Sequence, residues 1–245
     1  MQELAPLSDY ERLKGETPVV YAPSNGYTAA KVQRLLKTGT GVLSELLDVE
    51  PPRFEALLVA DEDWDEAPRE SERIYPRGLP YFTRSFRLPA LVLPISLSPA
   101  FQPRTEALYP IVVWHELAHA FVLQREIVRT PAWLREFVPQ TAAAVVARKE
   151  RLPLAEHLSR IEHEPGFTVR SSKRGANADE QMAFQNHLLA LGTAAAEEFG
   201  DEFLKKLVDA LWKDKGIIDE KRSEQMLVGA LGPGGREWLE SRPEF

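Results

Sequence analysis

The sequence contains no cysteine among its 245 residues. This absence excludes disulfide bonds, thiolate metal ligands and a cysteine nucleophile together, so any metal ion must be held by His, Asp or Glu. The sequence also lacks an excess of basic residues, because 30 Lys and Arg stand against 37 Asp and Glu and give a formal net charge of −7. With no global positive field to hold a phosphate backbone, we expect no nucleic acid partner.

Long apolar runs are missing as well. No segment reaches the roughly 20 apolar residues that a membrane-spanning helix needs. The N-terminal stretch "MQELAPLSDYERLKGE" has no basic region followed by an apolar one, as a signal peptide would have. We therefore expect a soluble, cytoplasmic protein with no membrane span; export with a signal since removed is the alternative. The sequence leaves the oligomeric state open.

The first hundred residues contain segments that are typical of strands. "TPVVYAP" (17–23) is a β-branched run closed by proline, and residues 27–49 then show apolar side chains at helical spacing. "RFEALLVA" (53–60) predicts a second strand, which leads into an acidic loop at 61–72. Residues 81–97 mix aromatic and branched side chains with two prolines, and because proline cannot donate to a ladder, we predict an edge strand there.

From Thr105 the chain is predicted to be helical almost to its end. Glycines at 200, 216 and 232 suit helix C-termini, and Asp201 and Asp219 suit N-caps. The sequence therefore predicts an α+β fold, with a small mixed sheet and one long helix in residues 1–104 and a helical part with the candidate site in residues 105–245. We expect the two parts to form one continuous domain. The predicted helices after the one that begins at Thr105 cover 133–149, 154–163, 178–200, 201–216 and 219–232.

The stretch "IVVWHELAHAFVL" (111–123) places two histidines and a glutamate in a run that is otherwise apolar. Buried polar groups destabilise a fold unless a partner satisfies them, so this helix requires a partner. Residues four apart in a helix are separated by about 40° around its axis and roughly 6 Å along it. His115 and His119 therefore project from one face, and Glu116 lies about 100° away from His115.

This spacing is that of the His-Glu-x-x-His zinc peptidases, in which two neutral imidazoles hold the metal and the glutamate is the general base. A catalytic zinc site needs a third protein ligand. "TPAWLREFVPQ" offers Glu136 on the opening turns of the next helix, which can return antiparallel. The alternatives are two satisfied core histidines with a snorkelling Glu116, and a Glu136 favoured only by the helix dipole.

"HELAH" followed by "PAWLREF" resembles the gluzincin class of zinc metallopeptidases, with a peptidase MA-like domain. The resemblance implies that His115, His119 and Glu136 are zinc ligands and that Glu116 activates the water. It also implies a zinc-dependent peptidase (a hydrolase) whose partner is a peptide or protein substrate. Such a substrate could pair with the predicted edge strand at 88–95.

The sequence departs from the gluzincin pattern in three places. Phe137 stands where the family usually has glycine, and Pro139 falls inside the predicted helix, where proline destabilises by about 3 kcal/mol or kinks the helix. We therefore expect the Glu136 segment to be displaced or bent around the site. Gln140 stands where thermolysin-like members carry an aspartate, and we predict that it accepts a hydrogen bond from a ligand imidazole.

An oxyanion donor, commonly His or Tyr in this class, is not evident. All six tyrosines precede the motif. Candidate donors are His187, Arg174 and Tyr81, followed by His157, His163 and Arg170. Together with the departures above, this supports an alternative function as a zinc-binding regulatory or interaction module that does not hydrolyse. A helix without metal is a third hypothesis.

Overall fold

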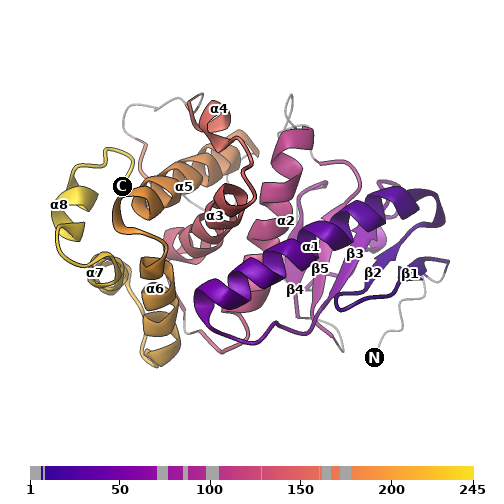
Figure 1. Cartoon of the computed structure of the whole chain (residues 1–245), viewed down its shortest axis with the longest axis horizontal. Helices are drawn as coiled ribbons and strands as arrows, with labels where there is room; N and C mark the ends of the chain where they lie inside the picture. The colour runs from indigo at the N-terminus through magenta and orange to yellow at the C-terminus, as the bar shows by residue number, and fades with distance from the viewer. Residues whose placement is uncertain are drawn as a thin grey trace. The chain divides into compact units, whose positions relative to one another are not determined.

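The computed structural model confirms the predicted α+β fold (Figure 1). The chain divides into two compact units. The first contains Met1–Gly41 and Glu50–Phe121, and the second contains Val42–Val49 and Val122–Phe245. The predicted division at residue 104 stays a prediction. The structure describes residues 7, 9–70, 77–84, 88–97, 105–127, 129–159, 161, 167–171 and 178–245, without the side chains of 105–107, 178 and 179.

Among the described residues of the first unit, five strands form one mixed sheet in the order β1-β2-β3-β5-β4. The three inner strands are parallel, and each edge strand is antiparallel to its neighbour. The predictions for β2 and β3 are confirmed in type and place. The strands are β1 (Glu11–Leu13), β2 (Val19–Tyr21), β3 (Glu55–Val59), β4 (Tyr81–Thr83) and β5 (Ala90–Pro94).

The predicted edge strand at 81–97 is instead two strands, β4 and β5. The prediction that residues 88–95 form an edge is wrong, because β5 lies between β3 and β4 and is buried along its length. The prolines are compatible with this place because neither interrupts the ladder. Pro89 precedes the strand and accepts a hydrogen bond from Glu55 N at 3.0 Å, and Pro94 ends the strand opposite Val59. The edge here is β4.

Helix α1 (Gly26–Leu47) follows β2 and leads to β3, and Figure 1 shows it running along one face of the sheet. Gly39 of this helix brings it close to α2 (Thr105–Val122), the helix that carries the motif. A Cβ at this position would lie 2.6 Å from Cδ1 of Trp114, whose indole N–H donates to the Leu35 carbonyl at 2.9 Å. Tyr109 hydroxyl donates to Pro94 at 3.4 Å, and burial raises the pKa of that hydroxyl, so it stays neutral. These contacts position the motif helix within the first unit.

The second unit is helical throughout its regular structure in the described residues. α3 packs chiefly against α5, and nearly all of α3 from Trp133 to Ala147 is buried. The predicted helix at 154–163 is short, ending at Leu158, with 160 and 162–166 outside the described residues. The helices are α3 (Ala132–Lys149), α4 (Leu154–Leu158), α5 (Ala178–Phe199), α6 (Glu202–Lys213), α7 (Glu220–Leu231) and α8 (Gly235–Glu240).

The predicted helix ends are confirmed in part. Gly200 and Gly232 have φ of +74° and +86°, and the Asp219 side chain caps α7 by accepting from Arg222 N at 2.8 Å. Asp201 makes no capping bond and instead pairs with Arg148, and Gly216 does not have a positive φ. No described helix is both long enough and apolar enough to span a bilayer.

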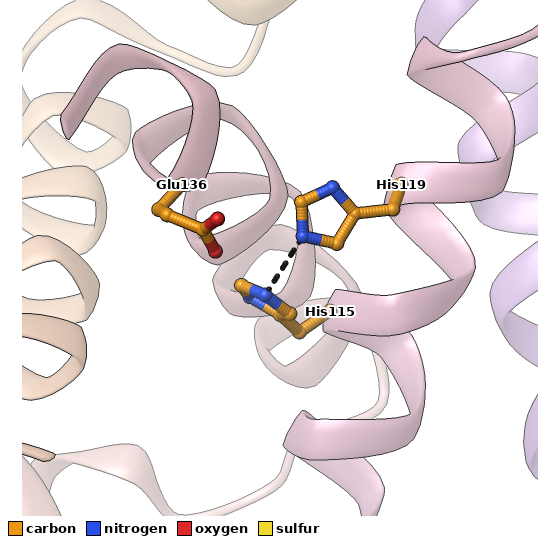
Figure 2. A group of neighbouring side chains, drawn as sticks. All are labelled: His115, His119 and Glu136. Atoms are coloured by element: carbon orange, nitrogen blue, oxygen red, sulfur yellow. Dashed lines mark hydrogen bonds between the residues drawn. The ribbon is translucent and has the colours of Figure 1, made fainter. Parts of the chain in front are cut away.

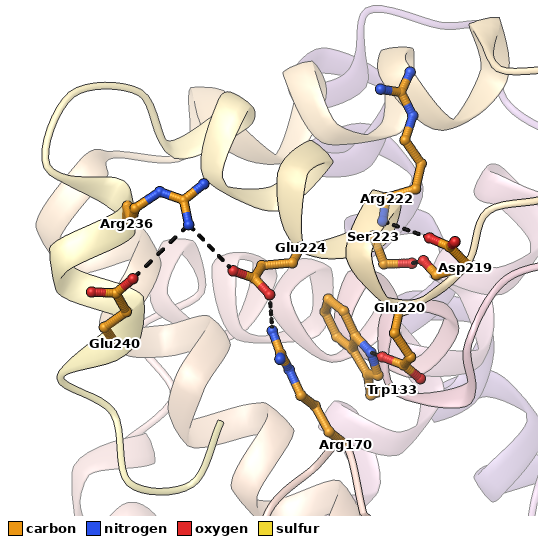
Figure 3. Close-up of polar contacts among 9 residues, drawn as sticks. All are labelled: Trp133, Arg170, Asp219, Glu220, Arg222, Ser223, Glu224, Arg236 and Glu240. Atoms are coloured by element: carbon orange, nitrogen blue, oxygen red, sulfur yellow. Dashed lines mark hydrogen bonds and ion pairs between the residues drawn. The ribbon is translucent and has the colours of Figure 1, made fainter.

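Polar contacts of α7 reach the first turn of α3 (Figure 3). The Trp133 indole N–H donates to Glu220 Oε2 at 2.6 Å. Glu224 pairs with Arg170 at 2.6 Å and with Arg236 at 3.6 Å. Because Trp133 lies in the first turn of the helix that carries Glu136, this contact ties the start of that helix to α7.

α3 and α5 approach each other closely at Gly192. An added methyl group there would lie 2.3 Å from Thr141 Oγ1 and 3.0 Å from Thr141 Cα, which is a backbone atom that cannot rotate away. We expect Gly192→Ala to lower the free energy of unfolding by about 1–3 kcal/mol, measured by urea denaturation, because the helices must separate. The control is Gly229→Ala on α7, where no atom lies within 4 Å. Equal stability of the two variants would contradict the prediction.

Candidate metal centre

The two histidines of the motif converge as their spacing predicts. Both belong to α2, and their Nε2 atoms lie 3.1 Å apart, with ring planes at 79° and centroids 4.8 Å apart. Two nitrogen ligands of a tetrahedral zinc ion, each at about 2.0–2.1 Å, lie roughly 3.3 Å from each other. The separation therefore suits a shared metal ion. It also suits a hydrogen bond between a donating and an accepting imidazole, which is the metal-free alternative.

Glu136 completes a group of three ligand side chains. It lies on α3, and Figure 2 shows its carboxylate directed toward the two imidazoles. One ligand atom from each of His115, His119 and Glu136 lies within 4.8 Å of the other two. Two imidazoles and a carboxylate are a donor set that zinc accepts. By chemistry and by separation, these residues fit a metal ion.

Glu116 lies beside this group. Its Oε1 is 4.0 Å from His115 Nε2. The exposed fractions of His115, Glu116 and Glu136 are 7%, 7% and 6%, so the polar groups lie in a shielded place where electrostatic interactions are strong. Glu116 is therefore near enough to act on a molecule held by the histidines without being one of the three grouped ligands.

Two of the three departures, Phe137 and Pro139, do not interrupt the helix of Glu136. α3 runs from Ala132 to Lys149 through Pro139, and Glu136 precedes the proline. Glu136 therefore stays in a continuous helix and within reach of the histidines, and the predicted bend of its segment around the site stays a prediction. Phe137 is fully buried and faces the ring of Phe203 on α6 at 6.4 Å, so the side chain that replaces glycine serves the packing of α3.

Gln140 makes a different contact from the predicted one. Its Nε2 donates to Oε1 of Gln185 on α5 at 2.5 Å, and the Nε2 of Gln185 donates to Oε2 of Glu136 at 3.2 Å. The hydrogen bond of Gln140 thus leads to Glu136 through a second amide, and the predicted role toward an imidazole is corrected. Sequence reasoning missed Gln185, which stands next to Asn186 and His187 and has no pattern that sets it apart from the other polar residues of its helix.

The candidate oxyanion donors are not brought together with the ligands by any described contact. The Tyr81 hydroxyl donates to the Pro68 carbonyl at 2.8 Å, and its ring packs edge-on against Trp64 in the core of the sheet. His187 is buried and stacks on Phe167 at 4.6 Å. Arg174 and His163 lie outside the described residues. Arg170 pairs with Glu224, and His157 contacts Asn186 at 3.2 Å.

Comparison with known proteins adds one structural likeness. No protein-family model matches the sequence, and none of the curated proteins matches it significantly. Among solved structures, native leukotriene A4 hydrolase from Saccharomyces cerevisiae is similar with a TM-score of 0.54 and 14% sequence identity. The likeness covers 96% of this chain and 38% of that chain, so the chain spans well under half of the hydrolase. The chain therefore shares the fold of part of a hydrolase, and its His115, His119 and Glu136 form a group able to hold a metal ion.

Proposed function

We propose that this chain is a zinc-dependent peptidase of the gluzincin type. The observation that carries the proposal is the meeting of both histidines of "HELAH" with Glu136 from the following helix. The fold shared with a hydrolase supports the same reaction class. His115, His119 and Glu136 would hold the zinc ion, and the substrate would be a peptide or protein.

The residues of the site have separate roles in hydrolysis. When bound, zinc supplies Lewis acidity, which acidifies water and polarises a carbonyl. Glu116 accepts a proton from the attacking water and delivers it to the leaving nitrogen, so water and one amide become a carboxylic acid and an amine, and transfer of the acid's proton to the amine leaves a carboxylate and an ammonium group. His115, Glu116 and Glu136 are each less than a tenth exposed, and this burial limits the access of bulk water to these steps.

A second candidate function is a zinc-binding module without hydrolysis. The Tyr81 hydroxyl is bound to Pro68, which removes one candidate for stabilising an oxyanion. In this function the same three ligands hold zinc, and Glu116 has no proton to transfer. Peptide cleavage by the zinc-loaded protein, assayed with a broad peptide library, separates the two functions.

Metal analysis tests what both functions share. We expect protein purified without added metal to contain about one zinc ion per chain, or to take one up on titration, because the three ligands already converge. Elemental analysis by mass spectrometry measures the content. A chain that contains no zinc and takes up none would contradict both the peptidase and the binding module.

A further inference from the structure

We propose that Gln185 is a positioning residue for Glu136 and that Gln140 in turn orients Gln185. The inference rests on the proposed function, since it concerns how a zinc ligand is held. It gives Gln140 a role toward the carboxylate ligand in place of the predicted role toward a histidine. The three side chains belong to α3 and α5, which pack against each other in the second unit.

The orientation of the two amide groups determines which atom of Gln185 faces Glu136. An amide side chain has an accepting oxygen at one end and a donating nitrogen at the other. Gln140 donates to the oxygen of Gln185 at 2.5 Å, so the nitrogen of Gln185 faces the other way. That nitrogen donates to Glu136 Oε2 at 3.2 Å. Gln140 therefore holds Gln185 in the one orientation in which it can bind a carboxylate.

The packing of the helices explains why this chain of contacts spans α3 and α5. Glu136 and Gln140 are four residues apart and so lie on one face of α3. Gln185 and Gly192 are seven residues apart and so lie on one face of α5. Gly192 approaches Thr141 closely, and Thr141 directly follows Gln140, so α3 and α5 lie close together at this level of the helices. Two amide side chains are then long enough to connect the helices and reach the carboxylate.

The hydrogen bond from Gln185 orients the Glu136 carboxylate for metal binding without neutralising the charge of the carboxylate. The terminal torsion of a glutamate is broad, so a free carboxylate loses rotational freedom when it becomes a ligand. A hydrogen bond to Oε2 removes part of that freedom beforehand. Because the amide is neutral, the carboxylate keeps its charge for the metal, whereas an Arg or Lys partner would compete with the ion. Partners of this kind typically change metal affinity by about 10- to 100-fold.

The test is a set of zinc dissociation constants, measured by competition with a chelator of known affinity. We expect Gln185→Met, which keeps the length and loses the donor, to weaken zinc binding by about 10- to 100-fold. Gln140→Met is expected to weaken it less, since Gln185 keeps its donor but loses its fixed orientation. Because Gln140 acts through Gln185, the double variant should bind no more weakly than Gln185→Met alone.

The control is Gln225→Met, the same change at an exposed position on α7, which should leave zinc binding unchanged. The thermal unfolding midpoints of the metal-free proteins separate positioning from folding and should agree closely for all variants. Equal zinc affinity of wild type and Gln185→Met would overturn the inference alone, whereas a wild type without zinc would overturn the proposed function as well. If Gln185→Met does not fold, Gln140→Met decides, and an unchanged affinity there would overturn the inference.

Discussion

Glu116→Gln is expected to leave zinc bound and to lower kcat for peptide cleavage by about 100- to 10,000-fold, the range that a general base contributes. The amide has almost the same shape as the carboxylate but cannot accept a proton from water. Glu116 is outside the group of three ligand side chains, with its Oε1 4.0 Å from His115 Nε2, so its loss should not release the metal. Initial rates on a cleaved peptide and zinc content of the same samples are the two measurements.

A matched control for this substitution is Glu126→Gln. Glu126 is exposed and follows the C-terminal end of α2, so the same change of charge occurs near the same helix without touching the site. Its kcat should equal that of the wild type. Full activity of Glu116→Gln would show that another group accepts the proton. Equal inertness of wild type and Glu116→Gln across a broad peptide library would favour the binding module.

The fold could be predicted from the sequence where local pattern alone determines the element. β2 and β3 arise from short runs of β-branched and aliphatic residues, and the Asp219 cap arises from a side chain three residues from its donor. β1 could not be predicted, because its three residues, ERL, are mostly polar and exposed. The place of β5 inside the sheet depends on which strands pair with it, and the prolines at its ends indicated an edge position that β4 occupies instead.

The site shows the same division between local and long-range determinants. The helical spacing of four residues predicts the convergence of His115 and His119. Glu136 was predicted from a motif on the next helix. Gln185 lies 49 residues beyond Glu136, and no spacing rule relates the two. Their contact follows from the packing of α3 on α5, and Gly192 allows these helices to approach closely. The sequence alone does not indicate which helices pack together.

Removing one ligand side chain should abolish tight zinc binding. We expect His119→Ala and Glu136→Ala each to weaken zinc affinity by more than the roughly 100-fold that outer partners contribute, because a donor itself is lost. The Nε2 atoms of the histidines are 3.1 Å apart, which also fits a direct hydrogen bond, and the variants separate these interpretations. If the two histidines form only a structural hydrogen bond, then breaking it would lower the stability of the fold by the same amount with and without a chelator.

Thermal unfolding with and without zinc provides the decisive measurement for the ligand variants. A ligand that binds only the folded state stabilises it by about 4 kcal/mol at 1,000 times its Kd, so wild type should gain a higher Tm with zinc. The gain should disappear in both variants and persist in the control Glu126→Gln. A Glu136→Ala protein that keeps the whole gain would place the third ligand elsewhere. A wild-type Tm insensitive to zinc and chelator would instead make the two histidines a hydrogen-bonded pair, because only a bound ion couples their contact to metal concentration.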